Sequence, residues 1–214
     1  MRSLPSPLLA VTDRHGHTRP LVETVQAILD GGGRWIWFRD KDLESDARRC
    51  LGEAVAARVQ AGGGILTVGG DVGLARALGA DGVHLGGGAD PEAIAAARIA
   101  LGEGALIGVS AHAPQEAARA AAAGADYVTL SPIYATTSKP GYGPALGPAG
   151  IAASRSAPFP VVALGGIGSG TIAACREAGA AGIAVMGGLM RAGDPAGAAR
   201  AFLTAWREAD PADT

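Results

Sequence analysis

The chain has 214 residues, 48% hydrophobic and 18% charged, with a formal net charge of -2 at pH 7. This length suits one large α/β domain, and the hydrophobic fraction excludes general disorder. The charge balance gives no basic face for nucleic acid, and no apolar run approaches the ~20 residues needed to cross a bilayer. A signal peptide is not recognisable, and Cys50 and Cys175 lie in no metal or redox spacing, so we expect a cytoplasmic protein.

Eight short apolar runs recur along the chain, and alanine-rich helical segments lie between them. The runs are continuous rather than alternating, which is typical of parallel strands buried on both faces. The predicted strands are 8–12, 35–39, 65–69, 82–85, 106–110, 127–130, 161–165 and 182–186. The clearest predicted helices are 21–30, 47–61, 115–123, 171–178 and 195–206.

A weak internal repeat supports this alternation. The segments LGADGVHL (78–85), AGADYVTL (123–130) and AGAAGIAV (178–185) each indicate a helix end, a glycine turn and a strand. Eight such units predict a single (β/α)8 barrel, in which the barrel covers about residues 8–206 and residues 209–214 form a frayed tail. An open doubly wound sheet is the alternative, but the first strand is followed by TDRHGH rather than a G-x-G-x-x-G turn.

The active site of such a barrel is built from the loops that follow the strands. Arg39 and Lys41 follow the second strand and are candidates for binding an anion. The alternative is a solvated pair balanced by Asp40 and Asp42. His112 follows the fifth strand and is a candidate for proton transfer near pH 7, although a histidine packed over the start of a helix is equally compatible with this position.

Two diglycine turns follow the last two strands, in LGGIGS (164–169) and MGGLM (186–190). Gly165, Gly166, Gly187 and Gly188 would let backbone N–H groups approach a phosphate. The alternative is that they only form tight turns. The loop 131–147 is long, and its hydroxyls and lysine suit a lid over an anionic substrate.

The set VTD (11–13), FRDK (38–41), GVSAH (108–112), GADYVTLSPIYATTSKPGYGP (124–144), ALGGI (163–167) and GIAVMGGL (182–189) resembles the thiamine phosphate synthase/TenI superfamily of barrels. The resemblance covers residues 8–206. It implies a phosphorylated thiazole as ligand and places the four glycines at its phosphate. It also implies that Ser110, Thr136, Ser138 and Lys139 contact substrate, and that His112 is the acid/base of the TenI branch.

The chain departs from the synthase branch at the residues that this branch uses for the pyrimidine and for Mg²⁺. Trp37 stands where synthases carry Gln, Gly69 and Gly70 stand at an Asn-Asp pair, and Ala89 replaces a second metal carboxylate. Asp71 and Asp90 remain nearby. We expect them to cap helices, with a shifted Mg²⁺ site as the alternative.

The resemblance and these departures together favour a TenI-like thiazole tautomerase, an isomerase with no metal and no other cofactor. The first alternative is a thiamine phosphate synthase, a transferase with a displaced Mg²⁺ site. The second is a non-catalytic protein that binds a thiamine precursor. The expected partner is the small-molecule thiazole phosphate, without nucleic acid or membrane, and the sequence leaves the oligomeric state open, a homo-oligomer included.

Overall fold

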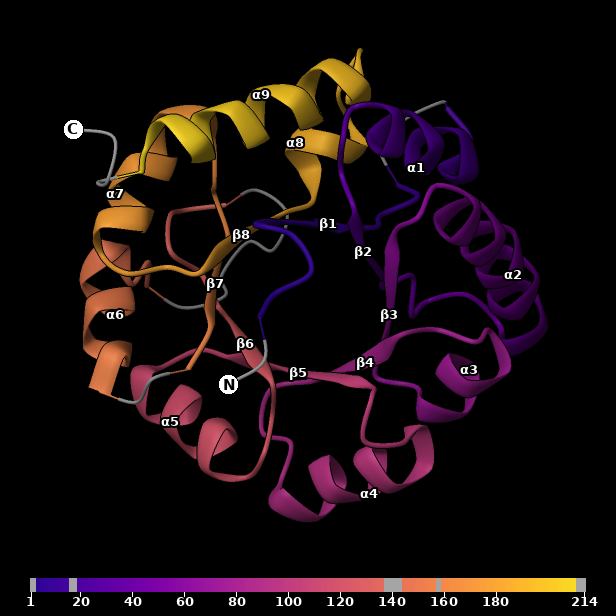
Figure 1. The fold of residues 1–214 in the computed structure, drawn as a ribbon, viewed down its shortest axis with the longest axis horizontal. Coiled ribbons are helices and arrows are strands. Elements are labelled where there is room, and N and C mark those ends of the chain that lie inside the picture. Colours follow the sequence, from indigo (N-terminus) through magenta and orange to yellow (C-terminus); the bar gives the residue numbers. More distant parts are fainter. Residues whose placement is uncertain (1–2, 16–18, 137–143, 157–158, 211–214) are drawn as a thin grey trace.

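The computed structural model describes residues 3–15, 19–136, 144–156 and 159–210. Eight parallel strands form a closed barrel in which each strand pairs with the next and β8 pairs with β1. Helices surround this ring on all sides (Figure 1). The strands are β1 Leu8–Val11, β2 Trp35–Phe38, β3 Ile65–Gly69, β4 Gly82–Leu85, β5 Leu106–Ala111, β6 Tyr127–Leu130, β7 Val161–Leu164 and β8 Gly182–Val185. The predicted barrel is therefore confirmed.

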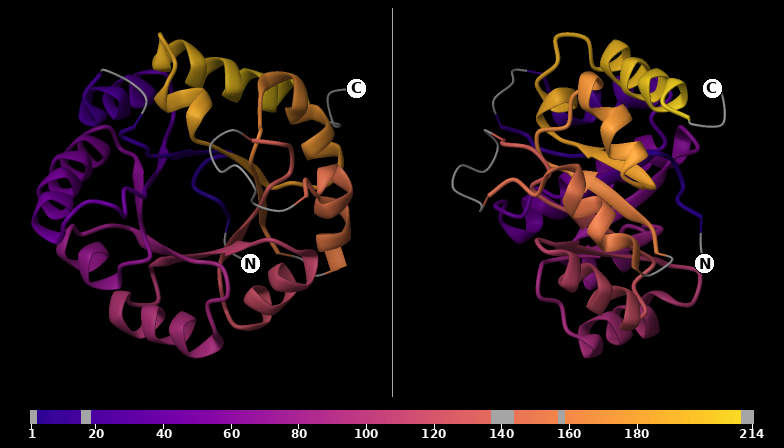
Figure 2. Two further views of the ribbon diagram at one scale, coloured as in Figure 1. Left: turned by 180° about the vertical axis from the view of Figure 1, so that it is seen from behind. Right: turned by 90° about the vertical axis from the view of Figure 1, so that its left-hand side faces the viewer.

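A helix follows each strand, with both α8 and α9 after β8, and the helices pack around the outside of the barrel (Figures 1 and 2). Among the described residues, no helix combines the length and apolar character that a membrane span requires. The helices are α1 Leu21–Asp30, α2 Ser45–Ala61, α3 Val72–Ala77, α4 Pro91–Leu101, α5 Pro114–Ala122, α6 Gly147–Ala153, α7 Ile172–Glu177, α8 Gly187–Met190 and α9 Pro195–Glu208, with 3-10 turns at Ser154–Ser156 and Ser169–Thr171.

The predicted strands match the structure to within one residue at each end. β3, β4 and β6 have the predicted bounds, β5 is one residue longer, and the other four end one residue early. The residues excluded from these four strands include Arg39, Gly165 and Met186, which line a cavity beyond the strand ends. In these four strands the predicted run thus extends one residue beyond the last residue of the strand.

The repeated helix-to-strand segments share one local structure. Gly79, Gly124 and Gly179 follow their helices with φ of 57°, 92° and 99°, a conformation that favours glycine. In the first two repeats an aspartate then ties the turn to a preceding strand. Asp81 accepts a 2.8 Å hydrogen bond from the backbone N–H of Leu66, and Asp126 accepts one of 2.8 Å from Ile107. The repeat therefore fixes where each strand enters the barrel.

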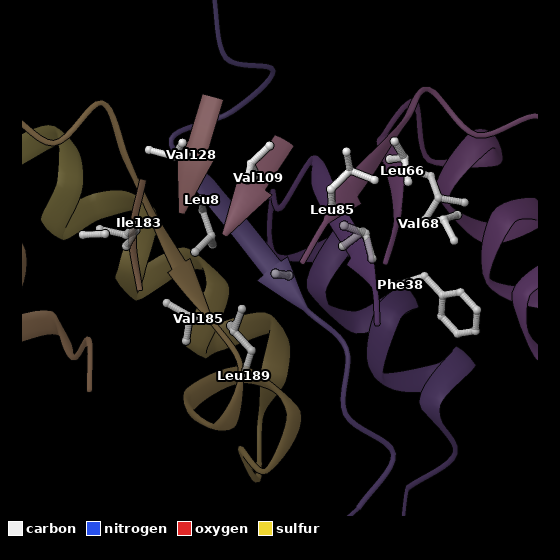
Figure 3. Packing of buried hydrophobic residues seen from close by; sticks show 14 of the residues in the cluster. Leu8, Phe38, Leu66, Val68, Leu85, Val109, Val128, Ile183, Val185 and Leu189 are labelled. Carbon is white, nitrogen blue, oxygen red and sulfur yellow. The ribbon is translucent and has the colours of Figure 1, made fainter. Parts of the chain in front are cut away.

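Side chains alternate between the barrel interior and the layer under the helices. The outer layer holds most of the aliphatic core, part of which is shown in Figure 3. The interior cluster has fewer and larger side chains, namely Leu9, Val11, Trp35, Trp37, Leu106, Tyr127, Val162 and Ala184.

The N-terminal end of the barrel is covered by the chain itself. Residues 3–7 cross the centre of the ring in Figure 1. Leu4 packs against the interior cluster, and the carbonyl of Pro7 accepts a 2.8 Å hydrogen bond from the N–H of Ile183. These contacts place the N-terminal segment against the barrel interior at this end.

Candidate functional site

A cavity of about 400 Å³ opens at the C-terminal ends of the strands. Small-molecule sites in barrels of this type are built at this end. Its lining combines positive charge, hydroxyls, one imidazole and several glycines. The lining includes Trp37, Arg39, Lys41, Gly87, Ser110, His112, Ser131, Thr136, Gly165, Gly166, Gly187, Gly188 and Arg191.

Arg39 and Lys41 reach the cavity because Asp40, between them, is turned the other way. Asp40 is 3% exposed, and it accepts hydrogen bonds from the Thr12 hydroxyl at 2.5 Å and from the Arg14 N–H at 3.0 Å. The Arg39 N–H donates to the same Thr12 oxygen at 2.9 Å. The strand end is thus tied to β1, and alternation places the two cations on the cavity side.

The charge-balanced interpretation of this segment is not what the structure shows. Asp42 pairs with Arg14 at 2.6 Å rather than with its neighbours in sequence. Within the described ranges, no carboxylate oxygen lies within 4 Å of the charged nitrogens of Arg39 or Lys41. Burial lowers the pKa of Lys41, and the positive charges of Arg39 and Arg48 lower it further. Arg39 and Lys41 thus present positive charge to the cavity without a carboxylate partner among the described residues.

His112 is the first residue after β5, and both its backbone and its ring form hydrogen bonds. Its backbone N–H donates to the Glu116 carboxylate at 2.7 Å, and its Nδ1 lies 2.9 Å from the carbonyl oxygen of Ser131. Because a carbonyl oxygen only accepts, Nδ1 carries the proton, and Nε2 is the acceptor nitrogen of the neutral ring. Nε2 lies on the side of Gly87, where an added Cβ would come within 3.1 Å of it. The His112 imidazole is thus positioned at the cavity wall.

A polar network inside the barrel reaches the cavity through Ser110. The fully buried His84 hydrogen-bonds to the Tyr127 hydroxyl at 2.9 Å and, through Nε2, to Ser110 at 3.1 Å and Thr129 at 3.2 Å. Burial, with a smaller contribution from the charge of Lys41, lowers the pKa of His84 to about 3. Burial also raises the pKa of Tyr127. Ser110 therefore joins the cavity to an uncharged interior.

Trp37 forms an aromatic wall of the cavity next to this network. Its side chain is buried, and its ring lies 3.9 Å from that of His84, centroid to centroid. Its Nε1 has no hydrogen-bond partner among the described residues. A Cβ on Gly69 would lie 2.9 Å from that nitrogen. The indole therefore occupies the space that a side chain at position 69 would need.

The first diglycine turn has a steric reason to be glycine. Gly165 and Gly166 have φ of 97° and 65°. A Cβ on Gly166 would lie 2.5 Å from the carbonyl oxygen of Ala135, and one on Gly165 would lie 3.0 Å from the Cα of Pro132. These glycines let the segment after β6 pack onto the end of β7. Their predicted role at a phosphate remains a prediction.

Asp71 and Asp90, the two aspartates considered for a shifted Mg²⁺ site, both cap helices. Asp71 accepts from the Leu74 N–H at 2.8 Å and pairs with Arg48 at 3.1 Å. Asp90, directly before a proline, accepts from the Ala93 N–H at 2.7 Å. In the part of the chain that the structure describes, no three His, Cys, Asp or Glu side chains form a group that could hold a metal ion. The capping interpretation of both residues is confirmed.

The structure brings most of the predicted site residues around this one cavity, although it does not by itself assign their roles. Ser138 and Lys139 lie outside the described residues. Arg191 lines the cavity and was missed by the sequence reasoning. Its position in the sequence could have indicated this placement. Arg191 lies four residues after Gly187, and one helical turn brings such a residue back over the start of a short helix.

Comparison with known proteins gives one consistent result. The family model described as thiamine monophosphate synthase matches residues 8–189. A putative thiamine-phosphate synthase of Geobacter sulfurreducens is 41% identical over 92% of this chain and 92% of its own length. The bifunctional protein ThiM/ThiE of Symbiobacterium thermophilum is 43% identical over 91% of this chain, which spans only 40% of that longer protein. The solved thiamine phosphate pyrophosphorylase of Pyrococcus furiosus is 29% identical and superimposes with a TM-score of 0.82, covering 94% of this chain and 96% of its own.

Proposed function

The chain belongs to the thiamine monophosphate synthase family, and on this premise we propose that it is an enzyme of thiamine biosynthesis with thiamine-phosphate synthase activity. The proposed reaction joins a thiazole phosphate to a pyrimidine pyrophosphate. The named relatives favour this transferase over the isomerase expected from the sequence. The proposal therefore adopts the first alternative considered for the sequence.

The observation that carries the proposal is the group of cations in the cavity. Arg39 and Lys41 have no carboxylate within 4 Å in the described part of the chain, although Lys41 is partly desolvated. Such charges favour an anionic ligand, because the ligand replaces both the lost solvent and the missing counter-charge. A pyrophosphate and a phosphate ester are ligands of this kind, and about 400 Å³ suits small molecules of this class.

The residues divide the proposed chemistry between them. The C–O bond of the pyrimidine pyrophosphate breaks, pyrophosphate leaves with the electron pair, and the thiazole nitrogen forms the new C–N bond. Arg39 and Lys41 stabilise the negative charge that develops on the leaving group. Ser110 and Thr136, with Ser138 and Lys139, orient the substrates. Gly165, Gly166, Gly187 and Gly188 provide the predicted turns for the thiazole phosphate.

The residues present do not fit the Mg²⁺ site of the synthase branch. Mg²⁺ is usually bound by one or two carboxylates together with substrate phosphates. Here Asp71 is committed to a helix cap and to Arg48, Asp90 caps the next helix, and position 89 is alanine. No step of the proposed mechanism is therefore assigned to a metal.

A thiazole tautomerase is the second candidate, and the geometry of His112 favours it. Nε2 is the acceptor nitrogen of the neutral ring, it lies at the cavity wall, and Nδ1 is held by a carbonyl. A base in this position could move a proton on a thiazole carboxylate phosphate, with Arg39 or Lys41 pairing with the carboxylate. General acid/base catalysis contributes ~10²–10⁴-fold in rate.

A paired assay with and without EDTA tests the proposal. One reaction offers thiazole phosphate, pyrimidine pyrophosphate and Mg²⁺, and the other offers the thiazole carboxylate phosphate tautomer. Thiamine phosphate in the first reaction supports the synthase. Aromatisation in the second alone, abolished in His112→Gln, would replace it with the tautomerase, and inactivity in both would leave the binding protein.

The cation group is tested in the same assay. Arg39→Gln should lower kcat/KM by roughly 10- to 100-fold, because one charge-assisted hydrogen bond contributes about 1.5–3 kcal/mol. Arg58→Gln, on the exposed side of α2, is the matched control and should retain full activity. Equal activity of the two variants would contradict the role given to Arg39.

A further inference from the structure

Arg191 is placed at the cavity by an ion pair between two neighbouring strand ends. It follows α8, directly beyond β8, and its Nη1 lies 3.1 Å from Oδ2 of Asp13, which follows β1. β1 and β8 are paired strands. Asp13 is itself held, because its Oδ1 accepts a 3.1 Å hydrogen bond from the His15 N–H. The side chains of Arg191 and Asp13 are 34% and 14% exposed, so one arm of the guanidinium is anchored at a partly buried carboxylate.

The other arm of the guanidinium lies over the turn between β8 and α8. A Cβ on Gly187 would be 2.0 Å from Nη2 of Arg191 and 2.8 Å from its Cζ. Gly187 is not among the described glycines with positive φ, so its backbone conformation does not require glycine. A side chain at this position would instead displace the end of the Arg191 side chain. The Arg191 guanidinium can therefore occupy this position only because residue 187 has no side chain.

We propose that Arg191 binds the phosphate group of the substrate, with Asp13 as the residue that positions it. A guanidinium presents a planar fork of N–H donors, so one edge can remain on Asp13 while another meets phosphate oxygens. Gly187, Gly188 and Arg191 line the same end of the cavity. This inference rests on the proposed function in one respect, namely that the ligand is a phosphorylated small molecule.

A purely structural role predicts different behaviour. If the Arg191–Asp13 pair only joined the ends of β1 and β8, its loss would lower stability and leave phosphate affinity unchanged. Because Arg191 is one third exposed, its ion pair is expected to contribute no more than about 1 kcal/mol, so Arg191→Gln is expected to fold. Phosphate affinity is therefore the measurement that separates the two roles.

The test measures binding of two ligands, inorganic phosphate and thiazole phosphate, by calorimetry and by ³¹P NMR. Arg191→Gln should weaken both by roughly 10- to 100-fold, as expected for one charge-assisted hydrogen bond. Arg191→Lys should recover part of this loss. Gly187→Ala keeps the charge but displaces the flexible end of Arg191, so a smaller loss is expected. Arg200→Gln is the matched control, since Arg200 is also paired with an aspartate, at 4.0 Å, and lies on α9.

The possible outcomes distinguish failure of the inference from failure of the proposed function. If wild type binds thiazole phosphate and the Arg191 and Gly187 variants bind within twofold of it, the inference is wrong and the proposed function stands. If wild type binds only inorganic phosphate, and does so through Arg191, the inference stands and the proposed function is wrong. Binding of neither ligand by wild type overturns both.

Discussion

Acidification should destabilise this protein through one buried imidazole, that of His84. It is fully buried between Tyr127, Ser110 and Thr129, with the positive charge of Lys41 nearby, and its pKa in the folded state is about 3. In the unfolded chain the pKa is near 6.5. Between these values the unfolded state binds a proton that the folded state does not. Stability therefore falls as pH drops below 6.5 and stops falling, as far as this group is concerned, below about 3.

The size of the effect follows from this pKa difference. Integrating the linkage relation from pH 7.5 to pH 5 gives a loss of about 2 kcal/mol from His84 alone. Most ordinary carboxylates are still ionised at pH 5. The assay is urea unfolding at pH 7.5 and pH 5 for wild type, His84→Gln and His112→Gln. Wild type and His112→Gln should show the loss, whereas His84→Gln should not.

Two results would refute this reasoning. The first is an equal pH dependence of wild type and His84→Gln. The second, which needs no variant, is titration of the His84 ring signals of the folded protein near pH 6.5 by NMR. Either result would show that the buried ring accepts a proton at a much smaller penalty than its surroundings imply.

Three further predictions concern other parts of the barrel. In wild type the KM of the phosphorylated substrate should rise at alkaline pH, beginning below pH 10.5, because the lowered pKa of Lys41 means that its ammonium group loses its charge below that pH. Lys41→Met should have a higher KM that no longer rises at alkaline pH. A pH profile of KM that is identical in both would contradict this. Gly108→Ala should destabilise by about 3 kcal/mol, measured by urea unfolding, because the new Cβ would lie 2.2 Å from Cζ of the buried Tyr127 ring; an unchanged midpoint would be the opposing result. Arg98→Met should lower the unfolding free energy by about 2 kcal/mol, because it removes the 2.7 Å partner of the largely buried Asp126, and Asp126→Asn in the same background should recover part of the loss.

The barrel was predictable because its strands and helices are each determined by residues close together in the sequence. Each strand is a short apolar run, and a glycine follows α1 to α5 and α7 within two residues, so the bounds of β3, β4 and β6 follow from the residues themselves. The same reasoning explains why His112, Arg39 and Lys41 were found. A barrel places the residue after each strand at one end, whatever the side chains between them do.

Features that depend on side-chain placement between distant segments were not predictable in this way. The position of the Arg191 guanidinium depends on Asp13, 178 residues earlier in the chain. The direction of Asp40, which decides whether Arg39 and Lys41 are neutralised, depends on the hydroxyl of Thr12. Such contacts are set by packing across the closed β1–β2 and β1–β8 pairs, and no sequence period reports them.

The contact between Trp37 and Gly69 constrains the order in which this cavity can change. A side chain added at position 69 while the indole is present would meet Nε1 at 2.9 Å, and the backbone at Arg39 and Phe38 would lie at 3.3 Å. Replacement of Trp37 by a smaller residue removes the nearest of these contacts first. The two positions are therefore epistatic. Amide side chains at positions 37 and 69 can be introduced without a steric clash with the indole when position 37 is replaced first, but not when position 69 is replaced first.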